Sequence, residues 1–245
     1  MAFNALNFTF NHVNAANSTV VGTSVSVFLC PSDVNAGKKT SFPAFTGLNA
    51  VASVTSYGVN EGDWYVWGGF GGPDNRGMFG PNRSRRVAEV TDGTSNTLLA
   101  TDVKVYQPLC RFTAFTNVKD PAADYDPAGD PATVEPSYAS PCTPGQSHTF
   151  WADGNVHETA MTTAWPPNRS TFGGSPRGDL DIETKLVSQG GPTFAAVTAR
   201  SYHAGGVNAL FADGGVRFVK SSVSGATWRA AGSPAGGEVV GGNSD

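Results

Sequence analysis

The stretch LFADGGV, residues 210–216, sets the pair Asp213-Gly214 between two apolar runs. Such a pair is among the strongest short-range signals of a β-hairpin, because Asp and Gly tolerate the positive φ that the turn needs. A second stretch, FWADGNV at residues 150–156, matches the first almost residue by residue and carries Asp153-Gly154 at the same place. We therefore predict two similar hairpins within one antiparallel system.

Three further segments have periodicity that predicts an element. Residues 19–29 (TVVGTSVSVFL) alternate small polar with β-branched and aromatic residues and end at a Cys-Pro-Ser-Asp turn, which predicts a first strand. Residues 51–59 predict another strand. The one full-length helix expected is short, from about Ser222 to Ala231, with Ser222 or Ser224 as its N-cap.

The composition favours turns and short strands. Charged residues make up 15% of the 245, against roughly 25% in an average domain, and the chain has 30 Gly and 16 Pro. The hydrophobic fraction of 39% is enough for a core. We expect a single domain over residues 1–245, of the α+β class, predominantly antiparallel β with long loops, including a loop insertion at 120–145 and a flexible tail at 236–245.

Charge and hydropathy exclude several classes of partner. The net charge of −4 and a pI near 5.5 give no general attraction for nucleic acid or for an anionic membrane. No apolar run reaches the roughly 18 residues of a membrane span, and residues 1–10 have neither the basic start nor the apolar stretch of a signal peptide.

The chain has three cysteines, an odd number. In an exported protein this means one pair and one unpaired thiol, or a partner outside this sequence. Cys110 precedes the Pro- and Asp-rich residues 120–144 and Cys142 lies near their end, and a bridge between the two cysteines would close a long loop. Three buried free thiols, with Cys30 as the third, are the alternative.

His203 is followed by nine residues and then by Asp213-Gly214, and this spacing resembles the H-X9-DG signature of a bacterial prepilin-like family, the domain of unknown function 1559 (DUF1559). Other blocks agree with that family in the same order along nearly the whole chain. They are Phe28–Asp33, Ser56–Asn60, Gly77–Phe79, Thr91–Thr97 with its residues Asp92, Gly93 and Asn96, Pro166–Asn168 and Gly236–Glu238.

The resemblance implies a relative of type IV pilins and pseudopilins: a leader, one long apolar helix and a β-rich head. It implies that this chain is the head, that residues 1–10 are the end of the helical stem, and that the anchoring helix is missing. Such a head lies outside the cell or at the envelope surface, as a structural or adhesive subunit of a filament or secretion apparatus that meets like subunits. The family helix often carries a Cys, which implies a partner for Cys30 and a Cys110–Cys142 disulfide.

The histidines admit two interpretations. His203 and Asp213 are half of a metal site or an acid–base pair, or His203 hydrogen-bonds the backbone of the Asp-Gly turn and fixes its register. If the two predicted hairpins touch, His148, Asp153 and His157 join His203 in a transition-metal cluster, which is the basis for a third hypothesis, a metal-dependent hydrolase. No Walker loop, dinucleotide fingerprint or nucleophile elbow is present in the sequence, so we do not expect an ordinary enzyme.

Two further groups of residues are candidate ligand sites. Asp120, Asp124, Asp126 and Asp130 offer hard oxygen ligands for calcium, as related pseudopilins use, although the spacing is not that of an EF-hand and a solvated acidic loop fits as well. Trp64, Tyr65 and Trp67 either stack on sugar faces or pack as core. The first interpretation, with an older description of the family as solute-binding, makes a carbohydrate- or solute-binding module the second hypothesis.

Overall fold

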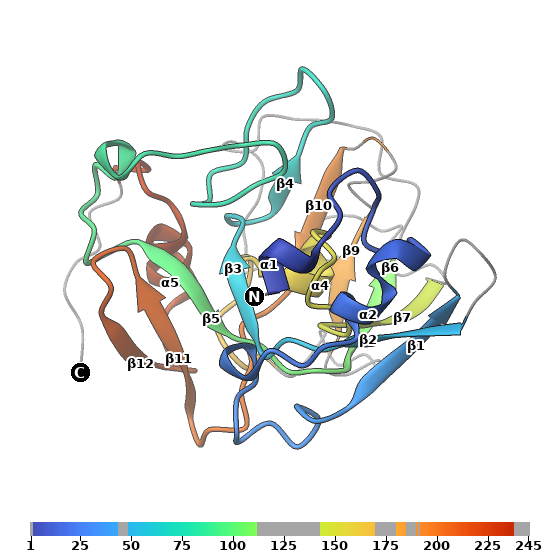
Figure 1. Cartoon of the computed structure of the whole chain (residues 1–245). Helices are drawn as coiled ribbons and strands as arrows, with labels where there is room; N and C mark the ends of the chain where they lie inside the picture. The colour runs from blue at the N-terminus through green and yellow to red at the C-terminus, as the bar shows by residue number, and fades with distance from the viewer. Residues whose placement is uncertain are drawn as a thin grey trace.

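The structure, a computed structural model, describes residues 2–43, 49–111, 143–169, 180–184, 190 and 192–237. Within these residues, 12 strands form two five-stranded sheets and a two-stranded ribbon, with short helices around them (Figure 1). Most strand pairs are antiparallel, and β3–β8 and β6–β9 are parallel. The predicted α+β, predominantly antiparallel fold is confirmed.

The first sheet has the order β4-β10-β9-β6-β7. Its strands are β4 (Tyr65–Trp67), β10 (Thr193–Ala196), β9 (Asp181–Glu183), β6 (Gln107–Arg111) and β7 (Thr143–Ser147). Tyr65, Ile182 and Phe194 are buried in one apolar cluster that includes Trp165. Burial on both faces explains why β4, β9 and β10 are fully buried strands without alternation.

The second sheet has the order β12-β11-β5-β3-β8. Its strands are β12 (Val216–Lys220), β11 (Gly206–Phe211), β5 (Leu98–Asp102), β3 (Tyr57–Asn60) and β8 (Ala160–Met161). The β11–β12 pair is the hairpin predicted from Asp213-Gly214, and Gly214 has the positive φ of 83° expected there.

Helix α5 (Gly225–Gly232) packs on one face of the second sheet, behind β5 and β11 in Figure 1. Its Trp228 is buried against Val207, Ala209 and Phe211, alternate residues of β11. Of the two predicted N-cap candidates, Ser224 caps the helix, because its hydroxyl accepts from the Thr227 backbone N–H. Because side chains alternate along a strand, Asn208 and Leu210 are left on the opposite face, which we call the outer face.

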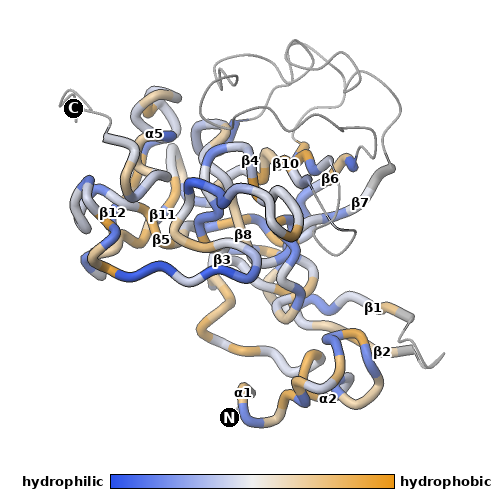
Figure 2. Tube along the Cα trace, turned by 90° about the horizontal axis from the view of Figure 1, so that it is seen from above, coloured by the Kyte–Doolittle hydropathy of each residue, from blue (hydrophilic) through white to orange (hydrophobic). Residues whose placement is uncertain are grey.

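The N-terminal part contains α1 (Ala2–Ala5), η1 (Ala15–Asn17), α2 (Ser18–Val21) and η2 (Ser26–Phe28), followed by the ribbon of β1 (Lys39–Pro43) and β2 (Asn49–Ser53). Figure 2 places α1, α2 and the ribbon on one side of the molecule. The strand predicted at 19–29 is wrong. The Thr23 hydroxyl donates to the Thr19 carbonyl, so local bonds satisfy the backbone there without a neighbouring strand.

Two other predictions are corrected. Residues 51–59 are divided between β2 and β3, because the Thr55 hydroxyl bonds both backbone groups of Tyr57 and breaks the strand. Residues 150–156 form no hairpin, since the Asp153 carboxylate accepts from the Asn155 backbone and the chain then enters α4 (Val156–Thr159). The alternation that continues after Val216 as Arg-Phe-Val-Lys is lacking after Val156.

The block Thr91–Thr97 fixes the hairpin to the C-terminal part of the described chain. It follows η3 (Val87–Glu89), and its Asp92 carboxylate accepts from the backbone N–H groups of Gly236 and Gly237. The Asp213 backbone N–H in turn donates to the Thr94 carbonyl. These motif residues therefore hold loops together. Among the described residues, no helix is long and apolar enough to cross a membrane.

Candidate functional site

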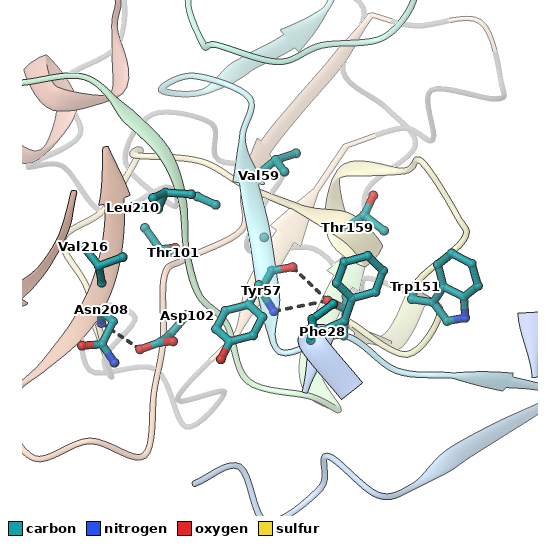
Figure 3. A pocket seen from close by; sticks show the side chains of 14 residues that line it. Phe28, Tyr57, Val59, Thr101, Asp102, Trp151, Thr159, Asn208, Leu210 and Val216 are labelled. Atoms are coloured by element: carbon teal, nitrogen blue, oxygen red, sulfur yellow. Dashed lines mark hydrogen bonds between the residues drawn. The ribbon is translucent and has the colours of Figure 1, made fainter. Parts of the chain in front are cut away.

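The outer face of the second sheet forms the floor of an apolar hollow of about 600 Å³. Figure 3 shows Val59, Thr101, Leu210 and Val216 on the sheet, with Phe28 and Trp151 at the far side. The hollow is lined by Val27, Phe28, Thr55, Tyr57, Gly58, Val59, Ala100, Thr101, Asp102, Trp151, Thr159, Asn208, Leu210 and Val216. Exposed apolar surface of this kind, rimmed by a few polar groups, is typical of an interaction or ligand site.

One end of the hollow is polar because Asp102 ends β5 there. The Asp102 carboxylate is buried, and its Oδ2 accepts from the Asn208 backbone N–H at 2.7 Å (Figure 3). Burial raises the pKa of Asp102, against the hydrogen bond from Asn208. Tyr57 lies beside it, and its pKa is raised by burial and by its electrostatic interactions with Cys30 and Asp102.

The same corner holds His203 and Cys30. His203 Nε2 lies 3.6 Å from Asp102 Oδ2 and 3.9 Å from Cys30 Sγ. The three groups have ligand atoms within 4.8 Å of one another and form the one such group of potential metal ligands found among the described residues. The Tyr57 hydroxyl is hydrogen-bonded to Cys30.

The turn Cys30–Asp33 is positioned by its own last residue. The Asp33 carboxylate accepts from the Val105 backbone N–H at 2.9 Å and from the Asn35 backbone N–H at 2.8 Å. Val105 lies three residues after Asp102, so this bond brings the turn to the end of β5. Cys30 is a buried free thiol.

His203 does not contact the Asp-Gly turn, which corrects that interpretation of the His-X9-Asp-Gly spacing. His203 precedes β11 and Asp213 follows it, so the strand separates the two residues. Asp213 instead accepts from the Gly215 backbone N–H and pairs with Arg217 at 2.9 Å. The spacing therefore reflects one strand with a bonded loop at each end.

His148 and His157 lie in a different place, directly after β7 and in α4, and fall outside the group of potential metal ligands found among the described residues. His157 Nδ1 is 2.9 Å from Glu183 Oε2, and the His148 backbone N–H donates to the His157 carbonyl. Glu158 accepts from the Thr149 and Phe150 backbone N–H groups at 2.6 and 2.9 Å. We call these residues, with Glu61, Asp181 and Arg200, the enclosed cluster.

The enclosed cluster has strongly shifted protonation equilibria. Burial lowers the pKa of His148 to about 4. Burial also acts to lower the pKa of His157, but hydrogen bonds and charge from Glu158 and Glu183 outweigh it and raise that pKa to about 10. Burial and the charge of Glu183 raise the pKa of Glu61 to about 8. All these groups are shut off from solvent.

The aromatic residues predicted as a sugar platform are core residues. Trp64 and Tyr65 pack against Phe194, and the Tyr65 hydroxyl donates to the Pro73 carbonyl at 2.8 Å. Trp67 is also buried, and only the neighbouring Phe70 is exposed, at 87%. Because their faces are covered, Trp64, Tyr65 and Trp67 cannot stack on a sugar.

The acidic segment with Asp120, Asp124, Asp126 and Asp130 lies outside the described residues, and calcium binding there remains a prediction. So does Cys142. Cys110 is buried in β6, and the β6–β7 register pairs its neighbour Arg111 with Thr143, the residue after Cys142. The Cys110–Cys142 disulfide that the family resemblance implies therefore stays a prediction.

The sequence analysis did not identify Asp102 as a candidate site residue. It considered Cys30 only as a disulfide partner or a buried free thiol. Asp102 ends an apolar run directly after the turn-rich block 91–97, and no spacing connects it to His203, 101 positions later. The signal that the sequence does carry is an acidic residue at the end of a predicted strand. Its pairing with Cys30 depends on the contact between Asp33 and Val105, which the sequence does not reveal.

These features define a β-rich domain of two sheets, with an apolar hollow and a Cys–Asp–His corner on the outer face of one. The chain belongs to the family described as Protein of unknown function (DUF1559), whose model matches residues 4–225. No curated protein and no solved structure matches the chain.

Proposed function

We propose that this chain is the head of a prepilin-like protein at the cell surface and that it works as a structural subunit. The observation that carries the proposal is the apolar hollow on the outer face of the second sheet. Family membership and a low content of charged residues support it. The partner is a like subunit that contributes an apolar segment.

The rim of the hollow supports this choice of partner. Val27 and Val216 are 74% and 66% exposed, and Phe28 and Trp151 add aromatic surface to the lining. Burying such side chains contributes roughly 25 cal/mol per Å² of apolar area. Charged groups are nearly absent from the lining, in which Asp102 is the one acid and no Lys or Arg occurs. A peptide or helix with apolar side chains matches this surface better than a charged partner.

Sedimentation velocity over a range of concentrations tests the proposal. Val216→Asp places a charge on the rim and is expected to weaken self-association at least tenfold. Val87→Asp is the matched control, because Val87 is 69% exposed but does not line the hollow. A wild-type chain that stays monomeric at high concentration, or equal effects of the two variants, would contradict the packing role. Surface biotinylation of intact cells tests the location.

A second candidate function is solute or carbohydrate binding at the same hollow. Its volume of about 600 Å³ lies within the range of roughly 300–1,000 Å³ that small-molecule sites occupy. Trp151 offers an aromatic ring, and Asp102, Asn208 and Tyr57 offer polar groups. Glycan-array binding that is lost in Trp151→Ala and kept in Phe70→Ala, at an exposed aromatic residue outside the hollow, would favour this function over subunit packing.

A further inference from the structure

The Cys–Asp–His corner combines three side chains that come from separate parts of the chain. Cys30 lies in the turn after η2, Asp102 ends β5, and His203 lies in the loop before β11. All three present a ligand atom to the same small volume, within 4.8 Å of one another. Thiolate, carboxylate and imidazole are the three side-chain groups that zinc binds most often.

The geometry distinguishes a metal site from a nucleophile with its base. In a Cys–His–Asp triad, the thiol and the carboxylate contact different nitrogens of the imidazole, so that one orients the ring and the other gives up its proton. Here Cys30 Sγ and Asp102 Oδ2 both approach Nε2, at 3.9 and 3.6 Å. Two acceptors at one nitrogen are poorly arranged for proton transfer. They are well arranged to share a cation with it.

The distances fit a tetrahedral ion after a small adjustment. Zn–S of about 2.3 Å, with Zn–N and Zn–O of about 2.1 Å, place ligand atoms roughly 3.4–3.6 Å apart at tetrahedral angles. The observed separations from Nε2 exceed these values by only a few tenths of an ångström. A rotation of the half-buried His203 ring is enough to close the difference, since its side chain is 28% exposed.

Neighbouring groups hold the ligands and favour a cation. The Asn208 backbone N–H donates to Asp102 Oδ2, and the Ser201 hydroxyl accepts from the His203 backbone N–H. Such bonds orient metal ligands in known sites. Two anionic ligands balance a divalent ion, and the mixed sulfur and nitrogen donors disfavour calcium or magnesium.

The geometry points to a binding site for a zinc-class divalent transition metal, held by Cys30 Sγ, Asp102 Oδ2 and His203 Nε2. The fourth coordination position is open to solvent or to a small ligand, because the adjoining hollow reaches Asp102 and Tyr57. This site is independent of the subunit-packing role. It connects the turn at Cys30, the end of β5 and the loop before β11, so a bound ion stabilises the polar end of the hollow.

Titration of the reduced, folded chain with Zn²⁺ and with Co²⁺ tests the site. We expect one ion per chain and, for Co²⁺, a thiolate charge-transfer band in the near ultraviolet. Cys30→Ser is expected to abolish that band. Cys30→Ser and His203→Gln are each expected to weaken metal binding by more than about 100-fold, since loss of a group that only orients a ligand already costs about 10–100-fold in affinity. His12→Gln is the matched control, because His12 has a similar exposure of 29% and a carboxylate, Asp153, at 3.4 Å, but no thiol.

A second measurement needs no variant. Zn²⁺ is expected to slow alkylation of Cys30 by iodoacetamide at least tenfold, read from the Cys30 peptide by mass spectrometry, and Mg²⁺ is not. No stoichiometric zinc binding by the wild-type chain overturns the proposal. So does equal binding by the Cys30→Ser, His203→Gln and His12→Gln variants, or an alkylation rate that zinc leaves unchanged.

Discussion

The two histidine clusters differ in what surrounds them. In the enclosed cluster, His148 and His157 are almost completely buried and Glu158 accepts two backbone N–H bonds. In the Cys–Asp–His corner, His203 is partly exposed, and its two neighbours approach one nitrogen at the edge of a hollow. The first arrangement is closed off from solvent by burial and contains ion pairs, whereas the second lies at the edge of a hollow that is open to solvent.

Histidine and carboxylate side chains are common in catalytic sites. Where they are fully buried among ion pairs and hydrogen bonds, as in the enclosed cluster, a structural role is indicated. A buried charge is costly unless it is paired, and removing one partner exposes that cost. By contrast, potential metal ligands at the edge of a solvent-accessible hollow, such as those of the Cys–Asp–His corner, contribute little to the stability of the fold when the ion is absent. The two clusters should therefore respond in opposite ways to substitution, pH and metal.

The largest effect is expected for Glu158→Ala. The change leaves the buried Thr149 and Phe150 backbone N–H groups without their acceptor, and removes a charge partner of His157 at 3.4 Å. We expect a loss of about 3–5 kcal/mol in the free energy of unfolding, measured by urea denaturation. The control Glu89→Ala, at an exposed ion pair with Arg85, should change it by less than about 0.5 kcal/mol. Similar values for both would show that the enclosed cluster is not a structural centre.

A rise in pH should lower the stability of the folded chain through Glu61 of the enclosed cluster. Its pKa is raised to about 8 in the folded chain from an ordinary 4.5, so the folded state holds a proton that the unfolded state has lost. Stability then falls as the pH rises from 4.5 to 8, by a few kcal/mol at about 1.4 kcal/mol per pKa unit. Glu61→Gln should match the wild type at pH 4 and exceed it at pH 9 in urea denaturation. A variant that is less stable at both values would contradict this origin.

A fall in pH should lower the stability of the folded chain through His148 of the same cluster. Its pKa is lowered to about 4, so between pH 6.5 and 4 the unfolded state binds a proton that the folded state does not. The contribution of His148 to stability falls as the pH falls across this window, again by a few kcal/mol, and it opposes the contribution of Glu61 where the two windows overlap, between pH 4.5 and 6.5. His148→Gln should show a shallower loss over that window, followed by thermal unfolding. An unchanged slope would assign the acid sensitivity to other groups.

Zinc should stabilise the chain through the Cys–Asp–His corner. At 100 times the dissociation constant, an ion that binds only the folded state contributes about 2.7 kcal/mol, or about 5–10 °C in melting temperature for a chain of this size. Cys30→Ser should lose this shift and Glu158→Ala should keep it. The reverse pattern would place the metal at the enclosed cluster.

The smallest effect is expected for His203→Gln without metal. Its one ion pair, with Asp102 at 3.6 Å, is partly exposed, so the loss of stability should be under about 1 kcal/mol. Urea denaturation with chelator present measures it. A loss as large as that of Glu158→Ala would give His203 a structural role instead.

The sequence revealed local structure better than contacts between distant segments. The β11–β12 hairpin and the Ser224 cap of α5 were predictable because turn and cap chemistry is local. The hairpin predicted from the repeat at 150–156 was wrong. The Asp-Gly pair recurs there, but the residues that follow it lack the alternation of a strand. The burial of Trp64 and Tyr65 could not be decided from their spacing, because it depends on Phe194, about 130 positions away.

For the candidate site, the sequence singled out His203 but assigned it the wrong neighbour. Asp213 is close in the chain, yet β11 separates the two residues, while Asp102 and Cys30 arrive through strand pairing and a turn contact. The hollow was not predictable at all, because its walls come from η2, β3, β5, β11 and Trp151.

The most direct test of the two-cluster account is a crystal structure of the chain grown with zinc, with anomalous data at the zinc edge. We expect one anomalous peak bonded to Cys30 Sγ, Asp102 Oδ2 and His203 Nε2, and no metal at the enclosed cluster. A peak at His148 or His157, or none at the Cys–Asp–His corner, would contradict it.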